Sequence, residues 1–263
     1  MAISADNRAI LKGKIVGKIQ SKIVFAIVGA ALCGLATTGA LAMPITVPTS
    51  LNVGDQYRLA FVTSTVRNAT STDIAVYNSF VSAVAASQSE LAALGTTWKA
   101  IATTPGINAR DNTNTNPFVD GAGVPIFLLN DTILATGNAD LWDGPLPNPL
   151  EITQSGNTVP SLFAWTGSNA AGNNFGFPLG GASTNASIVG SPNTVTSGWV
   201  TSQFRMLPDE YAFYALSGVL TVEAAAIPEP APLGLMVLGL IGFLALRGKR
   251  TVRGAPAHEF RCA

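Results

Sequence analysis

The chain has 263 residues, with 15 basic and 15 acidic side chains, one histidine, two cysteines and 48% hydrophobic residues. Cys33, Cys262 and His258 all lie near the ends of the chain. The long central part therefore has no thiol or imidazole, which excludes nucleophilic catalysis by these groups and a zinc site built from them. Residues 44–228 contain five basic residues and twelve carboxylates, which gives a formal charge of −7. This negative charge argues against a nucleic-acid partner, because binding nucleic acid needs a basic surface.

The first 42 residues have the pattern of a signal peptide. Residues 1–22 carry five basic residues and one acidic residue, an apolar stretch follows from Ile23 to Ala36, and Ala40-Leu41-Ala42 fits a small-x-small cleavage site. We therefore expect signal peptidase to cut after Ala42, with Ala40 and Ala42 forming the cleavage motif. An uncleaved N-terminal anchor is the alternative, because the charged leader is long.

Residues 43–226 are expected to form one exported domain that starts with a strand and a helix. In residues 55–62, apolar side chains alternate, which predicts a strand. Ser71-Thr72-Asp73 offers caps for a helix whose apolar face begins at Ile74 and whose last turn ends at Gly95. The further strands are expected at residues 97–102, 124–129, 132–135, 162–166, 199–204, 211–216 and 219–222.

Two segments of this domain have the composition of loops. Residues 103–123 are rich in Asn, Asp, Thr, Pro and Gly, and residues 167–198 are rich in Gly, Asn and Ser. Asn130-Asp131 predicts a hairpin turn, since both residues tolerate a positive φ. A loop as long as 167–198 is usually functional or disordered. The prediction is a single α+β domain that is mostly β.

A set of short motifs runs through this domain in a fixed order. The motifs are Trp98 to Thr103 (Trp-Lys-Ala-Ile-Ala-Thr), Ala109 to Asn112 (Ala-Arg-Asp-Asn), Asn130, Leu141 to Gly144 (Leu-Trp-Asp-Gly), Trp165 to Gly167 (Trp-Thr-Gly), Gly172 and Gly198-Trp199. Over residues 54–222 this order resembles a bacterial group related to the endostatin-like branch of the C-type-lectin-like fold. The resemblance implies a strand and a helix, then a paired sheet, and a long loop before the last strands. It does not imply calcium-dependent sugar binding, because the Glu-Pro-Asn and Trp-Asn-Asp triplets that usually supply calcium ligands are missing.

Candidate ligand-binding residues lie in two of these motifs, Asp111 with Asn112 and Trp142 with Asp143. No cofactor is expected, and calcium is the one metal that the residues suggest. The hard oxygen donors of the kind calcium prefers are Asp111, Asn112, Asp120, Asn130 and Asp131. The alternatives are that these residues cap turns, or that Asp111 pairs with Arg110 to order the loop.

The tryptophans are expected to divide between the core and the surface. Trp98 and Trp165 flank short strands, as core aromatics do. Trp142 stands in a Trp-Asp-Gly turn, where we expect it to be exposed and free to stack on a sugar ring.

The C-terminal part has three features in order: Pro228-Glu229-Pro230, an apolar run from Leu233 to Leu246, and the basic residues Arg247, Lys249 and Arg250. Residues 227–253 resemble the PEP-CTERM sorting signal, in which an exosortase of the inner membrane recognises the tripeptide and cuts nearby. We expect a transmembrane helix at about 231–246 and a cytoplasmic tail at 254–263. The fourteen apolar residues would span roughly 21 Å, less than the ~30 Å hydrocarbon core, which suits a transient anchor.

These signals predict a protein that leaves a bacterial cytoplasm, passes through the inner membrane and reaches the cell surface or the extracellular matrix. Its expected partners are signal peptidase, an exosortase, the membrane and exopolysaccharide, and its expected role is structural or adhesive, without catalysis. One alternative is a periplasmic binding domain that stays anchored in the inner membrane. The other is an enzyme acting on polysaccharide through a carboxylate pair such as Asp143 and Glu151.

Overall fold

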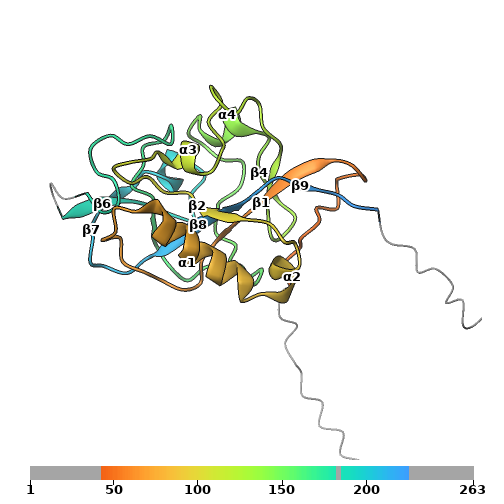
Figure 1. Cartoon of the computed structure of the whole chain (residues 1–263), viewed down its shortest axis with the longest axis horizontal. Helices are drawn as coiled ribbons and strands as arrows, with labels where there is room; N and C mark the ends of the chain where they lie inside the picture. Colours follow the sequence, from red (N-terminus) through yellow and green to blue (C-terminus); the bar gives the residue numbers. More distant parts are fainter. Residues whose placement is uncertain (1–42, 182–184, 225–263) are drawn as a thin grey trace, which may run out of the picture. The chain divides into compact units, whose positions relative to one another are not determined.

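A computed structural model describes residues 43–181 and 185–224 of the chain (Figure 1). The predicted signal peptide with Ala40 and Ala42, the predicted transmembrane helix and the tail at 254–263 lie outside the described residues. In those two described ranges, no helix has the length and apolar character needed to cross a membrane.

The described residues form a mixed nine-stranded sheet in the order β4-β3-β1-β8-β5-β6-β7, with β2 added to β8 and β9 added to β1. β1 and β8 lie at the centre and run antiparallel, whereas the β1–β3 and β5–β8 pairs are parallel. β7 ends the order, and the only strand it pairs with among the described residues is β6. The strands are β1 (Gln56–Val62), β2 (Trp98–Ala100), β3 (Ile126–Leu128), β4 (Ile133–Ala135), β5 (Ala164–Trp165), β6 (Ala186–Gly190), β7 (Gln203–Met206), β8 (Ala212–Ser217) and β9 (Leu220–Thr221).

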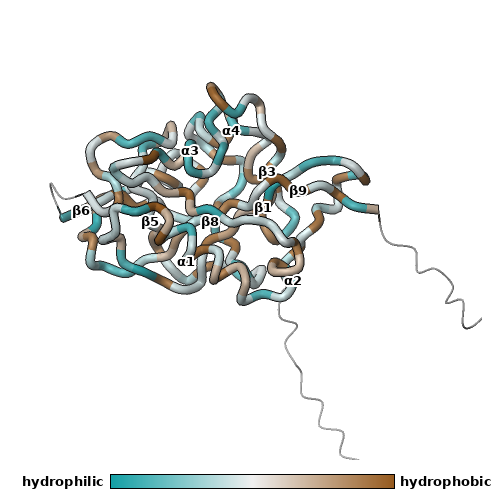
Figure 2. Tube along the Cα trace, viewed as in Figure 1, coloured by the Kyte–Doolittle hydropathy of each residue, from teal (hydrophilic) through white to brown (hydrophobic). Residues whose placement is uncertain are grey.

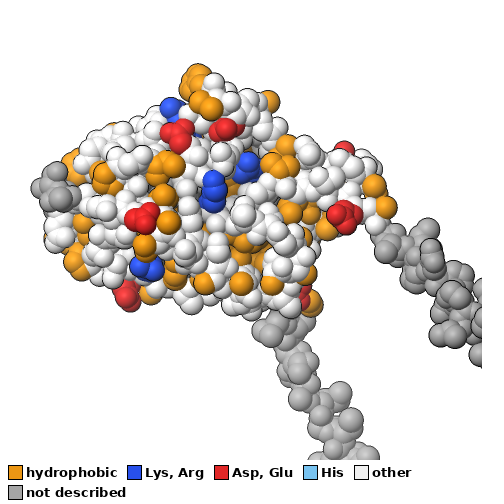
Figure 3. All heavy atoms as spheres, viewed as in Figure 1, with side chains coloured by type: hydrophobic (Ala, Val, Ile, Leu, Met, Phe, Trp, Pro, Cys, Tyr) orange, Lys and Arg blue, Asp and Glu red, His pale blue; other side chains and the backbone are white. Residues whose placement is uncertain are grey.

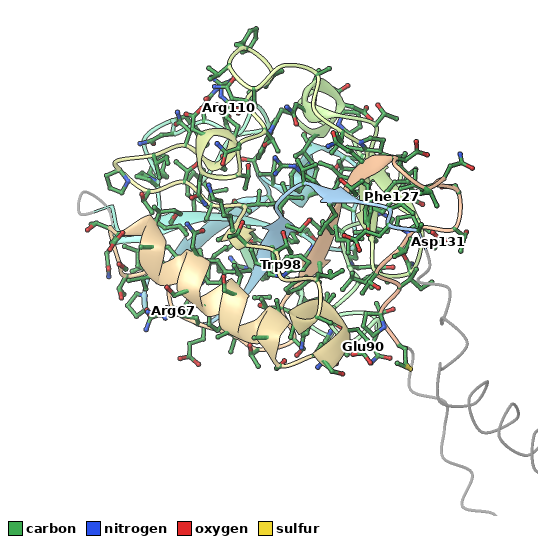
Figure 4. All side chains as sticks on the ribbon, turned by 45° about the vertical axis from the view of Figure 1, so that its right-hand side comes forward. Arg67, Glu90, Trp98, Arg110, Phe127 and Asp131 are labelled. Atoms are coloured by element: carbon green, nitrogen blue, oxygen red, sulfur yellow. The ribbon has the colours of Figure 1, made fainter. Side chains whose placement is uncertain are left out.

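One long helix packs against this sheet, and the other helices are single turns. The Asp73 carboxylate accepts a hydrogen bond from the Ala75 amide at 2.9 Å, so α1 begins at the predicted cap. Figure 4 shows Trp98 between α1 and the strands, where its carbonyl accepts from the Ser82 hydroxyl at 3.0 Å. The helices are α1 (Ile74–Ala86), α2 (Ser89–Ala92), α3 (Ala109–Asn112), α4 (Asn138–Leu141) and the 3₁₀ turn η1 (Ser197–Trp199).

Two tyrosines carry their hydroxyls into this core. Tyr77 of α1 stacks on Phe213 of β8 with 5.1 Å between ring centroids and donates a hydrogen bond to the Ser71 carbonyl at 2.8 Å. Burial raises the pKa of Tyr77 to about 12. Burial also raises the pKa of Tyr214, whose hydroxyl donates to the Trp199 carbonyl at 2.9 Å. Both side chains are therefore neutral at ordinary pH.

The structure confirms a mostly β domain with few helices, and it corrects four local predictions. Residues 167–198 are not all loop, because they contain β6, which pairs with β5 on one side and β7 on the other. Trp199 ends η1 instead of starting a strand, so β7 begins at Gln203. The predicted loop 103–123 contains the single turn α3, and α4 was not expected. The predicted hairpin is present, with Asp131 at φ 70° between β3 and β4.

Both ends of the described domain are bonded to it by their backbones. The Ile45 amide donates to the Leu129 carbonyl at 2.8 Å, three residues after Ala42. At the other end, Val222 donates to the Asp55 carbonyl and accepts from Gly54, both at 2.9 Å. The fold therefore extends to within a few residues of each predicted processing site.

Candidate functional site

The predicted metal ligand Asp111 is part of a hydrogen-bond network that orders the loop around α3. Its two carboxylate oxygens accept from the side-chain amides of Asn108 at 2.7 Å and Asn116 at 2.6 Å. The Arg110 guanidinium lies over the Phe118 ring, 5.7 Å from its centroid, instead of bonding Asp111 (Figure 4 labels Arg110). In residues 43–181 and 185–224, no group of three or more Asp, Glu, His or Cys side chains gathers in a form that could hold a metal.

Asn112, the second predicted ligand, is buried and joins three elements. Its amide nitrogen donates to the Ala100 carbonyl of β2 at 2.7 Å. It also exchanges hydrogen bonds with the Asn78 amide of α1, at 2.9 and 3.0 Å. Asn112 is therefore placed to hold α3 against α1 and β2, and its polar atoms are already paired.

The prediction that Trp142 is exposed is wrong, because only 6% of this residue is accessible. Its indole nitrogen donates to the Thr115 hydroxyl at 2.9 Å, and its ring packs at 5.8 Å from that of Trp199. Gly172, at φ +74°, approaches so closely that a Cβ there would lie 2.8 Å from the Trp142 ring. Asp143 is exposed beside it. Trp98 and Trp165 are buried, as predicted.

The described residue set exposes apolar side chains at the β7 end of the sheet. Phe204 and Met206 alternate with Gln203 and Arg205 along β7, and about half of each apolar side chain is accessible. In Figure 3, hydrophobic side chains reach the surface at the left end of the view, where Figure 1 places β6 and β7. We call this region the β7 surface; it comprises Phe163, Phe175, Phe177, Phe204, Arg205, Met206, Asp209 and Tyr211.

Aromatic contacts fix the side chains of the β7 surface. Phe204 meets Phe177 edge-on, with 4.6 Å between centroids. The Arg205 guanidinium lies 4.4 Å from the Phe163 centroid, and Phe163 packs at 5.7 Å on the Tyr211 ring. Such contacts reduce the rotamer freedom that binding would otherwise remove.

Two hollows meet at Phe204. The larger, which we call the Arg205 hollow, has a volume of about 420 Å³ and is lined by Ala186, Phe204, Arg205, Met206, Asp209 and Tyr211. The smaller, the Phe175 hollow, has about 220 Å³ and is lined by Phe175, Ile188, Thr201, Ser202, Gln203 and Phe204. Because Phe204 lines both, an extended ligand could occupy the two together. The larger one falls in the ~300–1,000 Å³ range of small-molecule sites.

The Arg205 hollow holds three polar side chains with open bonding positions. Arg205 donates only to the neighbouring Phe204 carbonyl, at 3.1 Å, among the residues the structure describes. Within the same residues, neither the Asp209 carboxylate nor the Tyr211 hydroxyl has a hydrogen-bond partner, although both line the hollow. The site thus combines donors, acceptors and aromatic faces, and it contains none of the four individually predicted ligand-binding residues, Asp111, Asn112, Trp142 and Asp143.

The sequence carried a signal for this site in the alternation of Gln203-Phe204-Arg205-Met206. Alternating polar and apolar residues normally predict a strand with its apolar side chains in the core. Here β7 is an edge strand, and its apolar side chains remain accessible. Only the folded structure, in which this face of β7 is left uncovered, reveals that exposure.

The loop after α3 carries a second, separate apolar point. Phe118 and Val119 are the most accessible large hydrophobic residues of the described chain, at 86% and 78%. Figure 2 shows this hydrophobic tip on the loop above α4. Neither residue lines the Arg205 hollow or the Phe175 hollow, so the two form a comparison for the β7 surface.

Comparison with known families identifies the C-terminal segment. Residues 226–250 match the model of the PEP-CTERM protein-sorting motif. The matched range contains Pro228, Glu229 and Pro230, together with the predicted basic residues Arg247, Lys249 and Arg250. The motif indicates an exported protein that passes the membrane and is processed by an exosortase. No curated protein matches the chain.

Proposed function

We propose that this exosortase-sorted chain is a non-catalytic binding module that attaches to exopolysaccharide at the cell surface or in the extracellular matrix. The observation that supports it is the β7 surface, where Phe175, Phe204 and Met206 remain accessible around two hollows that share Phe204. Exposed aromatic side chains next to polar groups are typical of recognition surfaces.

The chemistry of a polysaccharide suits this surface. Each sugar ring offers a face of C–H groups that packs on an aromatic ring, and a rim of hydroxyls that both donate and accept. Phe204 and Tyr211 supply rings, and Arg205 and Asp209 supply a donor and an acceptor within one hollow. A polymer that continues past Phe204 would enter the Phe175 hollow, so two sugar units contribute to one binding event.

We further propose that this binding needs no calcium. The polar atoms of Asp111 and Asn112 form hydrogen bonds within the domain. Asp209 is the single carboxylate that lines the Arg205 hollow. A calcium site usually takes six to eight oxygen ligands. Adding EDTA should therefore change neither the melting temperature nor the amount of ligand retained. A loss of retention that added calcium restores would contradict this part of the proposal.

Co-sedimentation with extracellular matrix from the producing cells tests the binding role. The exported protein should pellet with the matrix, and the double variant F204A/M206A should stay mostly in the supernatant. The matched control is F118A/V119A, which removes two even more accessible apolar side chains from the loop after α3. If both variants pellet like the unmodified protein, the β7 surface does not carry the attachment.

Intact mass of the protein recovered from the cell surface separates sorting from anchoring. We expect a mature chain that ends near Pro228–Pro230, since the exosortase motif covers residues 226–250. A surface form that retains Arg250 would instead support the anchored periplasmic domain.

A further inference from the structure

We infer that the Arg205 hollow selects an uncharged sugar unit, so that the ligand is a neutral polysaccharide and not an acidic one. This inference rests on the proposed function above and names the class of its ligand. It depends on the charges and open bonding groups of Arg205, Asp209 and Tyr211.

The charges around the hollow disfavour an anionic unit. Asp209 lines the hollow together with the one basic residue, Arg205, and the next residue in the chain, Glu210, is also an exposed carboxylate. Another basic residue, Arg67, forms a backbone bridge with Tyr211. Its guanidinium lies over the Tyr77 ring, 5.9 Å from the centroid, and does not line the hollow. With −7 on residues 44–228, the domain also repels a polyanion at long range.

The surroundings of the Arg205 guanidinium also disfavour an acidic sugar. A site for a carboxylate sugar usually presents arginine donors without a competing carboxylate, because the pair of charge-assisted bonds then goes to the ligand. Here Asp209 lines the same hollow as Arg205 without forming an ion pair with it in the described structure. An acceptor and a donor held apart in this way fit two neighbouring sugar hydroxyls. One hydroxyl would donate a hydrogen bond to the Asp209 carboxylate, and the other would accept one from the Arg205 guanidinium.

The apolar lining completes the match to a neutral ring. Phe204 and Met206 are about half accessible and border the polar groups, so a C–H face can pack there while its hydroxyls meet Asp209 and Tyr211. Desolvating uncharged hydroxyls costs far less than desolvating a carboxylate. Binding should consequently depend weakly on salt, since few ion contacts form.

The test measures retention of the exported protein on two immobilised sets of purified polysaccharides. The neutral set contains glucans, mannans and galactans, and the acidic set contains alginate and polygalacturonate. We expect binding to at least one neutral polymer, unchanged by added salt, and weakened about tenfold, which is about 1.4 kcal/mol, by Asp209→Asn or Tyr211→Phe, because each change removes or weakens one hydrogen bond to the ligand. The control F118A/V119A should bind normally, and unchanged melting temperatures show that the variants are folded.

Each other outcome has a distinct meaning when matrix co-sedimentation is measured in parallel. Preference for acidic polymers, lost with salt and increased by Asp209→Asn, overturns the neutral class and leaves the binding role standing. Matrix binding without retention on either purified set also overturns this inference, because the ligand is then not such a polysaccharide. Loss of matrix binding as well would overturn the proposed function itself.

Discussion

Replacing Trp142 with alanine tests whether this tryptophan serves the fold or a ligand. A buried tryptophan removes on the order of 200 Å² from water, which at ~25 cal/mol per Å² corresponds to about 5 kcal/mol. Measured Trp→Ala changes in cores cost about 3–5 kcal/mol, and the lost bond to Thr115 contributes about 1 kcal/mol more. Trp142→Ala should therefore remove at least ~3 kcal/mol from an unfolding free energy of about 5–15 kcal/mol.

Guanidinium unfolding of the exported protein, followed by tryptophan fluorescence and circular dichroism, measures this loss. Trp142→Phe keeps most of the buried ring and should lose only about 1–2 kcal/mol, mainly the bond to the Thr115 hydroxyl. Phe118→Ala is the surface control and should stay within ~0.5 kcal/mol of the unmodified protein, because that side chain is 86% accessible. The reasoning fails if Trp142→Ala unfolds at the same denaturant concentration as this control, or if it abolishes matrix binding while leaving stability intact.

Three further changes test the packing and the buried hydroxyls. Gly190→Ala places a Cβ 1.7 Å from the Trp199 carbonyl oxygen, so we expect little folded protein at the surface, measured by quantitative immunoblot. Asn112→Ala removes the bond to the Ala100 carbonyl and leaves the side-chain nitrogen of Asn78 without its acceptor, so it should lower stability by about 1–3 kcal/mol in the same guanidinium assay, whatever the calcium concentration. Because folding raises the pKa of Tyr77, its contribution is complete below pH 10 and is lost as pH rises from about 10 toward 12; Tyr77→Phe should flatten the fall of melting temperature in that range.

Local patterns in the sequence were enough to predict the elements whose burial follows from their own residues. The alternation of Tyr57, Leu59 and Phe61 predicted β1, and the Asp73 cap predicted the start of α1. Both depend on contacts within a few residues, where periodicity and capping have a direct physical meaning.

The candidate site could not be predicted in this way because it depends on distant partners. Trp142 is buried by Thr115 and Trp199, which lie far from it in the sequence. β6 forms in a segment of loop-like composition because β5 and β7 pair with it from both sides. Phe204 and Met206 are exposed because the face of β7 that carries them is left uncovered by the rest of the fold, which no local pattern encodes.

If residues 231–246 cross the membrane as predicted, the backbone bonds at Val222 would set a short clearance between the folded domain and the bilayer. Pro228 lies six positions after Val222, a stretch that spans at most about 21 Å when extended, little more than the ~16 Å radius of gyration of a domain of this size. Before cutting, the domain would hang within about its own radius of the bilayer, and the exosortase would have to work in that gap. Releasing the Val222 bonds and the two-residue strand β9 from β1 would lengthen this connection.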